Sequence, residues 1–260
     1  MKFKNKKSLG QNFVIDKNIL KIITDVGKIS KNDKVIEVGP GNGNLTQYLI
    51  NKNPKYLKII EKDNELIKIL SDKFKDQIEI FHDDILKVNE NFYEDGVIIY
   101  GNLPYNISTK ILANWCLSKN IKFKKLILMF QKEVADRIIA NINTKEYSRI
   151  TILANWKFDI KKIIDINPEC FFPKPKVKSS VLEFIPKNNF VEIKNPKNLE
   201  KITKIFFNQR RKMIKKNFIK LFKNFDLVAE KINIKLTDRP QKISINKFLM
   251  IIREYENGLN

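Results

Sequence analysis

The sequence predicts an α/β fold: an open, mostly parallel sheet with helices on both faces, followed by a smaller, all-helical C-terminal domain. Over the first two-thirds of the chain, short apolar runs that suit buried strands alternate with segments of helical spacing. Beyond Pro186 the apolar residues recur at helical spacing, and basic residues outnumber acidic ones. At 260 residues, the chain is long enough for one or two domains with buried cores.

The predicted strands are short runs of apolar and β-branched residues. Their alternation with helices favours a parallel order, because parallel neighbours need a crossover connection. The strands are expected at Lys34–Val38, Tyr56–Ile60, Ile78–Phe81, Val97–Tyr100 and Leu126–Phe130, with two more candidates at Trp156–Ile164 and Ser180–Ile185.

Amphipathic helices are predicted between these strands. Asp63 is placed to cap one of them, in which Leu66, Ile67 and Leu70 share one face. The other helices are expected near Asn44–Ile50, from about Ser108, and through Val134 and Ile138.

Residues 187–260 are predicted to form a separate basic helical domain, with residues 1–186 as the α/β domain. This segment carries 18 Lys and Arg residues against 7 Asp and Glu residues, a net charge of +11 out of +21 for the whole chain. Its apolar residues at helical spacing are Leu199, Ile202, Ile205, Phe206, Ile214, Phe218, Leu221 and Phe222.

The formal charge of +21 indicates a polyanionic partner. An AT-rich genome also adds lysines without a mechanistic reason, so the few arginines are the sharper signal. Arg210 and Arg211 are adjacent and are followed by Lys212. Because the planar guanidinium binds phosphate as a fork, these three residues are predicted to form a phosphate-binding surface for the polyanionic partner. The alternative is that the arginine pair packs between helices.

Other classes of protein are disfavoured by what the sequence lacks. No apolar run approaches the ~18 residues of a membrane helix, and no apolar stretch of signal-peptide length follows the basic start Met1–Lys7. Cys116 and Cys170 lack metal-ligand spacing, and His82 has no second histidine to join it. We therefore expect a cytoplasmic protein that uses no metal.

A glycine-rich turn follows the first predicted strand, within Glu37–Gly43. Gly39 and Gly41 allow a sharp turn and a close approach of the backbone to a ligand, so both are candidate cofactor-binding residues. The spacing G-x-G-x-G differs from the G-x-G-x-x-G of dinucleotide binders. With no second phosphate-binding signature, S-adenosylmethionine fits better than NAD.

Acidic residues at two further strand ends support an adenosine ligand. Glu61 follows the second strand, 22 residues past Gly39, where a carboxylate can accept both ribose hydroxyls. Asp83 and Asp84 follow the third strand, and either can accept from an adenine amine. The alternative is that Glu37 and Glu61 are solvated charges at strand ends.

The run Asn102-Leu103-Pro104-Tyr105 closes the apolar strand that starts at Val97. Proline cannot continue a central strand, so the chain turns there. The turn offers an amide oxygen, free carbonyls and an aromatic ring. This set suits a flat heterocycle with an exocyclic amine, which stacks on Tyr105 while Asn102 and Leu103 accept the amine hydrogens.

These residues resemble the KsgA-type rRNA adenine dimethyltransferases. The similarity extends in order from Gly10 to about Pro240, and its motifs are jointly specific. The matching segments are Gly10–Val14 (G-Q-N-F-L in the family), Glu37–Gly43, Asn102–Ser108, Leu128–Val134, Phe171–Val177 (F-x-P-x-P-K-V) and Asn208–Lys212 (N-Q-R-R-K).

The resemblance implies a Rossmann-like methyltransferase domain and a smaller C-terminal helical domain. It implies N6,N6-dimethylation of two adjacent adenosines in a hairpin loop near the 3′ end of small-subunit rRNA, with S-adenosylmethionine as methyl donor. Phe171 would sandwich the target base with Tyr105, and Asp84 is chosen over Asp83. The implied cofactor positions are Asn12, Val14 (Leu in the family), Gly39, Glu61, Asp84 and Asn102.

The expected partners are small-subunit rRNA and the assembling small ribosomal subunit, and a monomer is expected. Two alternatives stay open. An Erm-type enzyme modifies one adenine of large-subunit rRNA, and a non-catalytic ribosome-assembly or nucleic-acid-binding factor can use the same scaffold. The intact glycine turn, Glu61 and the Asn102–Tyr105 run favour retained chemistry.

Overall fold

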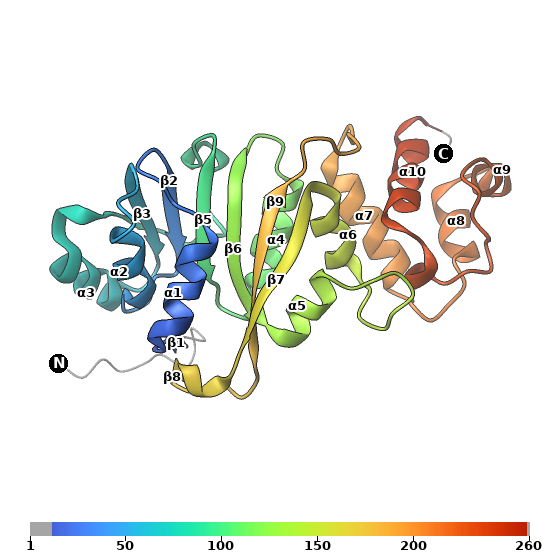
Figure 1. The fold of residues 1–260 in the computed structure, drawn as a ribbon. Coiled ribbons are helices and arrows are strands. Elements are labelled where there is room, and N and C mark those ends of the chain that lie inside the picture. Colours follow the sequence, from blue (N-terminus) through green and yellow to red (C-terminus); the bar gives the residue numbers. More distant parts are fainter. Residues whose placement is uncertain (1–11, 259–260) are drawn as a thin grey trace. The chain divides into compact units, whose positions relative to one another are not determined.

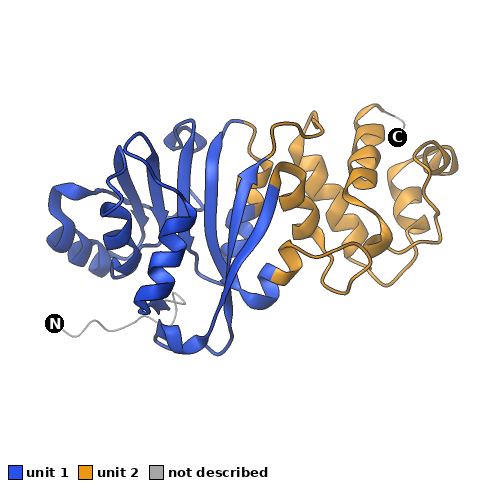
Figure 2. Cartoon of the chain, in the orientation of Figure 1, with its two compact units in different colours: residues 1–112, 120–135, 159–186 blue, residues 113–119, 136–158, 187–260 orange. Residues whose placement is uncertain are grey.

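A computed structural model of the protein describes residues 12–258. Gly10 and Gln11, which begin the first motif, lie outside the described residues. Contacts divide the chain into two compact units (Figure 2). Unit 1 extends to residue 112 and also contains residues 120–135 and 159–186, whereas unit 2 contains residues 113–119, 136–158 and 187–260.

Unit 1 contains a seven-stranded sheet in the order β4-β3-β2-β5-β6-β9-β7 within the described chain (Figure 1). Neighbours from β4 to β6 are parallel, and β9 is antiparallel to β6. The predicted mostly parallel α/β fold is therefore confirmed. The strands are β2 (Lys34–Val38), β3 (Tyr56–Glu61), β4 (Glu79–His82), β5 (Val97–Asn102), β6 (Phe123–Gln131), β7 (Phe158–Ile166) and β9 (Ser179–Pro186).

The strand order reverses between β2 and β5, because the chain builds outward to β4 and then returns to the other side of β2. In open α/β sheets, ligands bind beyond the carboxyl ends of the strands at such a point. The helices that accompany these strands are α1 (Lys17–Val26), α2 (Asn44–Ile50), α3 (Asn64–Phe74), α4 (Ser108–Leu117) and α5 (Lys132–Ile138).

Side-chain caps define where two of these helices begin. The Asp63 carboxylate accepts from the Glu65 amide at 3.0 Å, as the sequence predicts for α3. Asp16 does the same for α1, accepting from the amides of Asn18 and Ile19. Helix α1 was not anticipated from the sequence, although its buried residues Leu20 and Ile23 follow helical spacing.

A second, two-stranded sheet joins segments far apart in the sequence. β1 (Phe13–Val14) pairs antiparallel with β8 (Phe171–Phe172), with Phe13 opposite Phe172 and Val14 opposite Phe171. The Ile15 amide extends the pairing by donating to the Cys170 carbonyl at 2.9 Å. This ladder fixes the start of the described chain against the segment that carries the F-x-P-x-P-K-V motif.

Unit 2 is mainly helical, and its core is aromatic. The ring of Phe206 contacts Phe218 and Phe248 edge-to-face, with centroids 5.9 and 5.3 Å apart. The buried Tyr147 hydroxyl donates to the Ile243 carbonyl at 2.9 Å. The helices are α6 (Arg149–Lys157), α7 (Pro196–Phe207), α8 (Lys215–Leu221), α9 (Phe225–Lys231) and α10 (Ile245–Glu256).

One predicted strand begins too early. Trp156 lies in α6, not in a strand, and β7 begins at Phe158, where the backbone becomes extended. Helix α6 continues through Lys157, since the Phe158 amide still donates to the Ala154 carbonyl, and the Trp156 indole donates to the Val191 carbonyl at 2.7 Å. The predicted domain boundary after Pro186 stays a prediction.

Candidate active site

An open cavity of about 1050 Å³ lies in unit 1 beyond the carboxyl ends of β2, β3 and β5. This is the place that the reversal of strand order selects. The cavity brings together predicted site residues from five segments of the chain. The predicted site residues that line the cavity are Asn12, Gly39, Gly41, Glu61, Asp84, Asn102, Leu103, Pro104 and Tyr105. Asp83 also lines it.

The glycine turn requires glycine at three positions. Gly39, Gly41 and Gly43 have φ of +68°, +60° and +78°, in the left-handed region that side chains disfavour. A Cβ on Gly41 would lie 2.4 Å from the Phe13 ring, and one on Gly43 would lie 2.4 Å from Phe74. The turn is therefore open at Gly39, where a Cβ would meet no atom closer than 3.7 Å, and tightly packed at Gly41 and Gly43.

Glu61 is a fixed acceptor on the cavity wall. Its side chain is buried, and Oε1 accepts from the amides of Lys62 and Asp63 at 2.8 and 2.9 Å. Burial raises the pKa of the Glu61 carboxyl, and backbone hydrogen bonds, that of Asp63 foremost, oppose the rise. Glu61 is thus a buried, oriented carboxyl and not a solvated strand-end charge.

Asp83 and Asp84 have different surroundings, although both line the cavity. Asp84 is half-buried, and its two oxygens accept from the Leu86 amide at 3.0 Å and from Lys62 Nζ at 2.8 Å. The hydrogen bond from Lys62 foremost lowers the pKa of Asp84. Asp83 is exposed, and its Oδ1 accepts from the Asp84 amide at 2.7 Å. The choice of Asp84 over Asp83 stays a prediction.

Asn102 is oriented by the start of the described chain. Its Nδ2 donates to the Asn12 carbonyl at 2.7 Å. Because a carbonyl can only accept, the NH2 group must face Asn12, which leaves the amide oxygen on the other side. That oxygen has no hydrogen-bond partner among residues 12–258, so an external N–H donor can use it.

The Tyr105 ring is held in place at both ends. Its hydroxyl shares a 2.6 Å hydrogen bond with Oγ of Ser179, a fully buried residue of β9. Its backbone lies in a turn closed by the amides of Ile107 and Ser108, which donate to the Pro104 carbonyl at 3.1 and 3.0 Å. Burial raises the pKa of Tyr105, so the phenol stays neutral at physiological pH.

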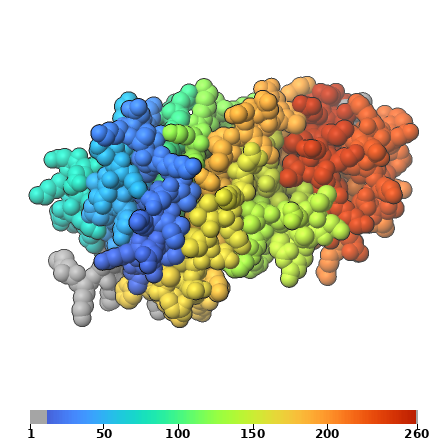
Figure 3. Space-filling view, in the orientation of Figure 1, coloured from blue at the N-terminus to red at the C-terminus, as the bar shows by residue number. Residues whose placement is uncertain are grey.

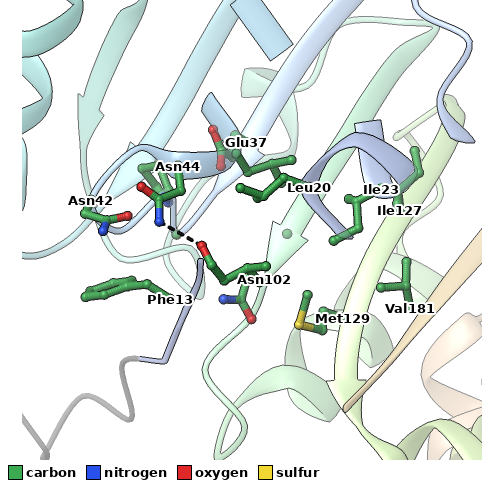
Figure 4. Close-up of a pocket in the computed structure, with 15 residues that line it drawn as sticks. Phe13, Leu20, Ile23, Glu37, Asn42, Asn44, Asn102, Ile127, Met129 and Val181 are labelled. Atoms are coloured by element: carbon green, nitrogen blue, oxygen red, sulfur yellow. Dashed lines mark hydrogen bonds between the residues drawn. The ribbon is translucent and has the colours of Figure 1, made fainter. Parts of the chain in front are cut away.

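A second cavity of about 470 Å³ adjoins the first (Figure 4). Phe13, Gly39 and Asn102 line both cavities, so these residues stand where the two meet. The rest of the wall is mostly apolar and includes Leu20 and Met129. Val14, a predicted cofactor-binding residue, lines only this second cavity.

The backbone carbonyl of Val14 is already engaged in the structure. It accepts from Nδ2 of Asn44 at 2.7 Å, the dashed line in Figure 4. Its side chain is buried. A cofactor contact through this carbonyl therefore has to share the oxygen with Asn44, and the predicted role of Val14 stays untested.

Glu37 is a site residue that the sequence analysis did not assign. It is 2% exposed and lines the second cavity, and its Oε2 accepts from the Thr46 hydroxyl at 2.6 Å. Burial raises the pKa of Glu37 to about 7, Glu61 adds to the rise, and Thr46 and Lys73 oppose it. The sequence feature that could have identified Glu37 is a carboxylate within the apolar part of the strand Lys34–Val38.

The structure does not bring Phe171 to the cavity with Tyr105. Pairing with Val14 places Phe171 in the core, and its side chain is 3% exposed. The next residue, Phe172, is 64% exposed. The β1–β8 ladder thus buries the Phe171 ring, and its stacking on a target base stays a prediction.

The predicted RNA-binding residues lie together in a turn of unit 2. Arg210, Arg211 and Lys212 are exposed between α7 and α8, and the Arg210 guanidinium donates to the Lys145 carbonyl. Both arginine side chains are exposed, but the bond to Lys145 gives Arg210 a contact within unit 2, so a structural role for the pair stays an alternative to be tested. RNA binding by these residues stays a prediction.

Residues 12–258 contain no group of three or more His, Cys, Asp or Glu side chains placed to hold a metal ion. None of their helices combines the length and apolar character needed to cross a membrane.

The fold and site define a Rossmann-like methyltransferase. A dimethyladenosine transferase from Plasmodium falciparum superposes with a TM-score of 0.81 at 25% identity, covering 94% of this chain and 98% of that one. The 23S rRNA methyltransferase ErmE superposes with a TM-score of 0.68 at 20% identity, covering 94% and 99%, which shows a shared fold.

The model of the ribosomal RNA adenine dimethylase family matches residues 2–257, and the chain belongs to this family. A protein of Pelagibacter ubique (strain HTCC1062) named ribosomal RNA small subunit methyltransferase A is 52% identical over 257 residues, 98% of each chain. The protein of the same name from Ehrlichia ruminantium (strain Gardel) is 41% identical over 94% of each chain.

Proposed function

We propose that this enzyme uses S-adenosylmethionine to dimethylate N6 of two adjacent adenosines in the 3′-terminal hairpin loop of small-subunit rRNA. The observation that carries the proposal is the orientation of Asn102. Its amide oxygen is left without a partner among the described residues, at the junction of the two cavities. The names of the 52% and 41% identical relatives support the small-subunit substrate.

The residues of the two cavities fit the methyl donor. Glu61 offers a buried carboxyl to the ribose hydroxyls, and Asp84 or Asp83 offers one to the adenine amine. The open backbone at Gly39 admits a close ligand. The donor supplies an electrophilic methyl group on a sulfonium sulfur.

Glu37 is suited to the amino-acid end of the donor. One of its carboxylate oxygens is bonded to Thr46, and the other has no hydrogen-bond partner within residues 12–258. A buried carboxylate requires a compensating donor or positive charge, and an ammonium group provides both. We therefore assign Glu37 to the ammonium of the donor.

The target base is held by the Asn102–Tyr105 turn. The amide oxygen of Asn102 and the carbonyl of Leu103 accept the two N6 hydrogens and favour a pyramidal amine, whose lone pair can then face the methyl group. Tyr105, fixed through Ser179, stacks on the base. Positioning does most of the remaining work. As the N–C bond forms, the sulfur–methyl bond would break, S-adenosylhomocysteine would be the leaving group, and the proton lost from N6 would pass to water.

The second methylation changes the hydrogen bonding. Monomethylated N6 has one hydrogen left, so one of the two acceptors gives up its bond. Asn102 is held by Asn12, whereas Leu103 lies just beyond the end of β5. We infer that Asn102 keeps the remaining hydrogen and that the new methyl lies on the Leu103 side.

The basic residues of unit 2 support an RNA substrate. Arg210, Arg211 and Lys212 are exposed and offer donors to a phosphate backbone. Recognition by shape and backbone suits a structured hairpin, and the unpaired loop lowers the cost of taking a base out of its stack. We place the enzyme in the cytoplasm as a monomer that acts on the assembling small subunit.

Methyl transfer from labelled S-adenosylmethionine tests the proposal directly. Naked rRNA, immature small subunits and large-subunit RNA serve as substrates, and the modified nucleotides are mapped. Two adjacent dimethylated adenosines near the 3′ end of small-subunit rRNA are expected. Methylation of a large-subunit adenine instead assigns the Erm-type activity, and no transfer to any of these RNAs leaves a non-catalytic factor.

A further inference from the structure

Phe172 belongs to an exposed surface that the proposed chemistry does not use. Its side chain is 64% exposed, and those of Ile15 and Val177 are 50% and 46% exposed. Single exposed apolar side chains are ordinary, but three of them on short segments that the β1–β8 ladder joins indicate a binding surface. We call this the Phe172 surface. It comprises Ile15, Phe172, Lys174, Lys176, Val177 and Lys178.

The Phe172 surface lies next to the active-site cavity. In the β1–β8 ladder Phe172 is directly opposite Phe13, which lines both cavities. Directly paired residues of antiparallel strands have Cα atoms about 5 Å apart. Ile15 joins the same edge through its amide bond to Cys170. A base just outside the cavity is therefore within reach of the Phe172 ring.

The charge of this surface identifies the kind of partner. Lys174, Lys176 and Lys178 alternate along an exposed segment within the yellow part of the chain in Figure 3. Lys174 is paired with Glu169 at 2.5 Å, and Lys178 also interacts electrostatically with that carboxylate, whereas the side chain of Lys176 has no ion pair among residues 12–258. An exposed aromatic ring flanked by lysines is the usual combination for unpaired nucleic acid, where bases stack and phosphates meet ammonium groups.

We propose that Phe172 stacks on the unpaired rRNA base next to the target adenosine, with Lys176 and Lys178 on the neighbouring phosphates. This inference rests on the proposed function, in which two adjacent adenosines are modified. While one base occupies the cavity, its neighbour has left the loop stack and needs a new apolar face. Phe172 offers such a face, because it is paired directly with Phe13 of the cavity wall. Phe171 cannot offer one, because its ring is buried.

The experiment uses a hairpin RNA with 2-aminopurine in place of the base beside the target adenosine. Stacking on Phe172 quenches its fluorescence when the wild-type enzyme binds. We expect Phe172→Ala to lose this quenching and to raise KM for the hairpin about 10-fold. Phe172→Trp should retain both properties, and Phe172→Leu, which is apolar but not aromatic, should lose the quenching.

Two controls separate stacking from damage to the fold. Ile185→Ala removes another exposed apolar side chain of unit 1, 45% exposed and remote from both cavity linings, and should change neither readout. Binding of S-adenosylhomocysteine should be equal in the wild type and in Phe172→Ala, because Phe172 lines neither cavity.

Three results would overturn the inference. One is wild-type quenching and KM in Phe172→Ala, and another is full quenching in Phe172→Leu. The third is unchanged hairpin binding with weaker binding to assembled subunits, which assigns the surface to a ribosomal protein. If the wild type itself neither binds nor methylates small-subunit RNA, the proposed function fails, which is a distinct outcome.

Discussion

Asn102 shows how one hydrogen bond turns a common amide into a directed acceptor. An asparagine at a strand end has no preferred orientation, and its oxygen and nitrogen are equivalent in shape. The Asn12 carbonyl removes this ambiguity by accepting from Nδ2. The amide oxygen then becomes an acceptor of fixed direction beside Gly39, where the methyl donor is proposed to bind.

Replacement of Asn102 by alanine should stop catalysis without releasing the RNA. Loss of one directed acceptor that acts on the reacting nitrogen is expected to lower the rate of methyl transfer about 100- to 1000-fold. Most of the proposed RNA contacts lie elsewhere, so the dissociation constant for small-subunit rRNA should change less than about 3-fold. Asn114→Ala, at an exposed position outside both cavities, is the matched control. Wild-type transfer by Asn102→Ala contradicts the mechanism.

The burial of Glu37 leads to a prediction about how the free energy of unfolding depends on pH. Burial raises its pKa to about 7 from 4.5 in the unfolded chain. Between these pH values the folded protein binds more protons than the unfolded chain, so the free energy of unfolding falls as pH rises from 4.5 through 7. Glu37→Gln removes the charge and keeps an acceptor for Thr46. Without ligand, the variant should be more stable at pH 8 by about 3 kcal/mol, with no gain at pH 4.

Urea unfolding of both proteins at pH 4, 6 and 8 measures this difference. Equal pH dependence of the two proteins means that Glu37 is ionised and compensated in the free enzyme. S-Adenosylhomocysteine should bind Glu37→Gln more weakly than the wild type at pH 8. 5′-Methylthioadenosine, which lacks the amino-acid end, should bind both proteins equally if Glu37 holds the ammonium group.

At the scale of elements, the glycine turn joins the first strand of the sheet to the wall of the cavity. Its left-handed backbone leaves no room for a side chain at Gly41, because the Phe13 ring occupies that space. Phe13 belongs to β1, so the turn and the β1–β8 ladder support each other. Two separate requirements therefore select glycine at position 41: the left-handed backbone of the turn and the close packing of Phe13.

Gly41→Ala and Gly96→Ala can distinguish those requirements. Both glycines have positive φ, +60° and +76°, but a Cβ at Gly96 meets nothing within 4 Å. Gly96→Ala should cost about 1 kcal/mol of stability from backbone strain and leave binding of S-adenosylhomocysteine unchanged. Gly41→Ala should cost about 1–3 kcal/mol more and weaken that binding, because Phe13 must shift. Calorimetry of both variants tests this, and equal effects mean that packing against Phe13 is unimportant.

Local patterns in the sequence were sufficient to predict most strands of the sheet and many residues of the cavity wall. The apolar runs predict β2 to β6, and residues that follow strand ends predict the wall formed by Gly39, Glu61 and Asn102. The burial of Phe171 was not predictable in this way. It depends on pairing with Val14, more than 150 residues earlier, and no local pattern records that contact.

Across the whole molecule, positive charge alone does not mark the RNA surface, because part of the lysine content is structural. In unit 2, Lys187 Nζ donates to the Asn155 carbonyl at 2.7 Å near the end of α6, and Lys247 donates to the Asn233 carbonyl at 2.9 Å beyond α9. Lysines at helix C-termini satisfy carbonyls that lack partners and favour the helix dipole. The net charge of +21 therefore overstates the charge available to RNA.

The exposed Arg210 and Arg211 give a test that separates specific phosphate contacts from general charge. The double variant Arg210→Ala with Arg211→Ala should weaken binding of small-subunit rRNA about 10-fold at physiological salt. It should also reduce the slope of log K against log salt by about 2, one for each lost phosphate contact. Lys31→Ala with Lys68→Ala removes the same charge from exposed positions of unit 1 and should change the slope by much less than 2. Equal slopes for the two double variants mean that binding follows net charge, and that the arginine turn between α7 and α8 is not a specific site.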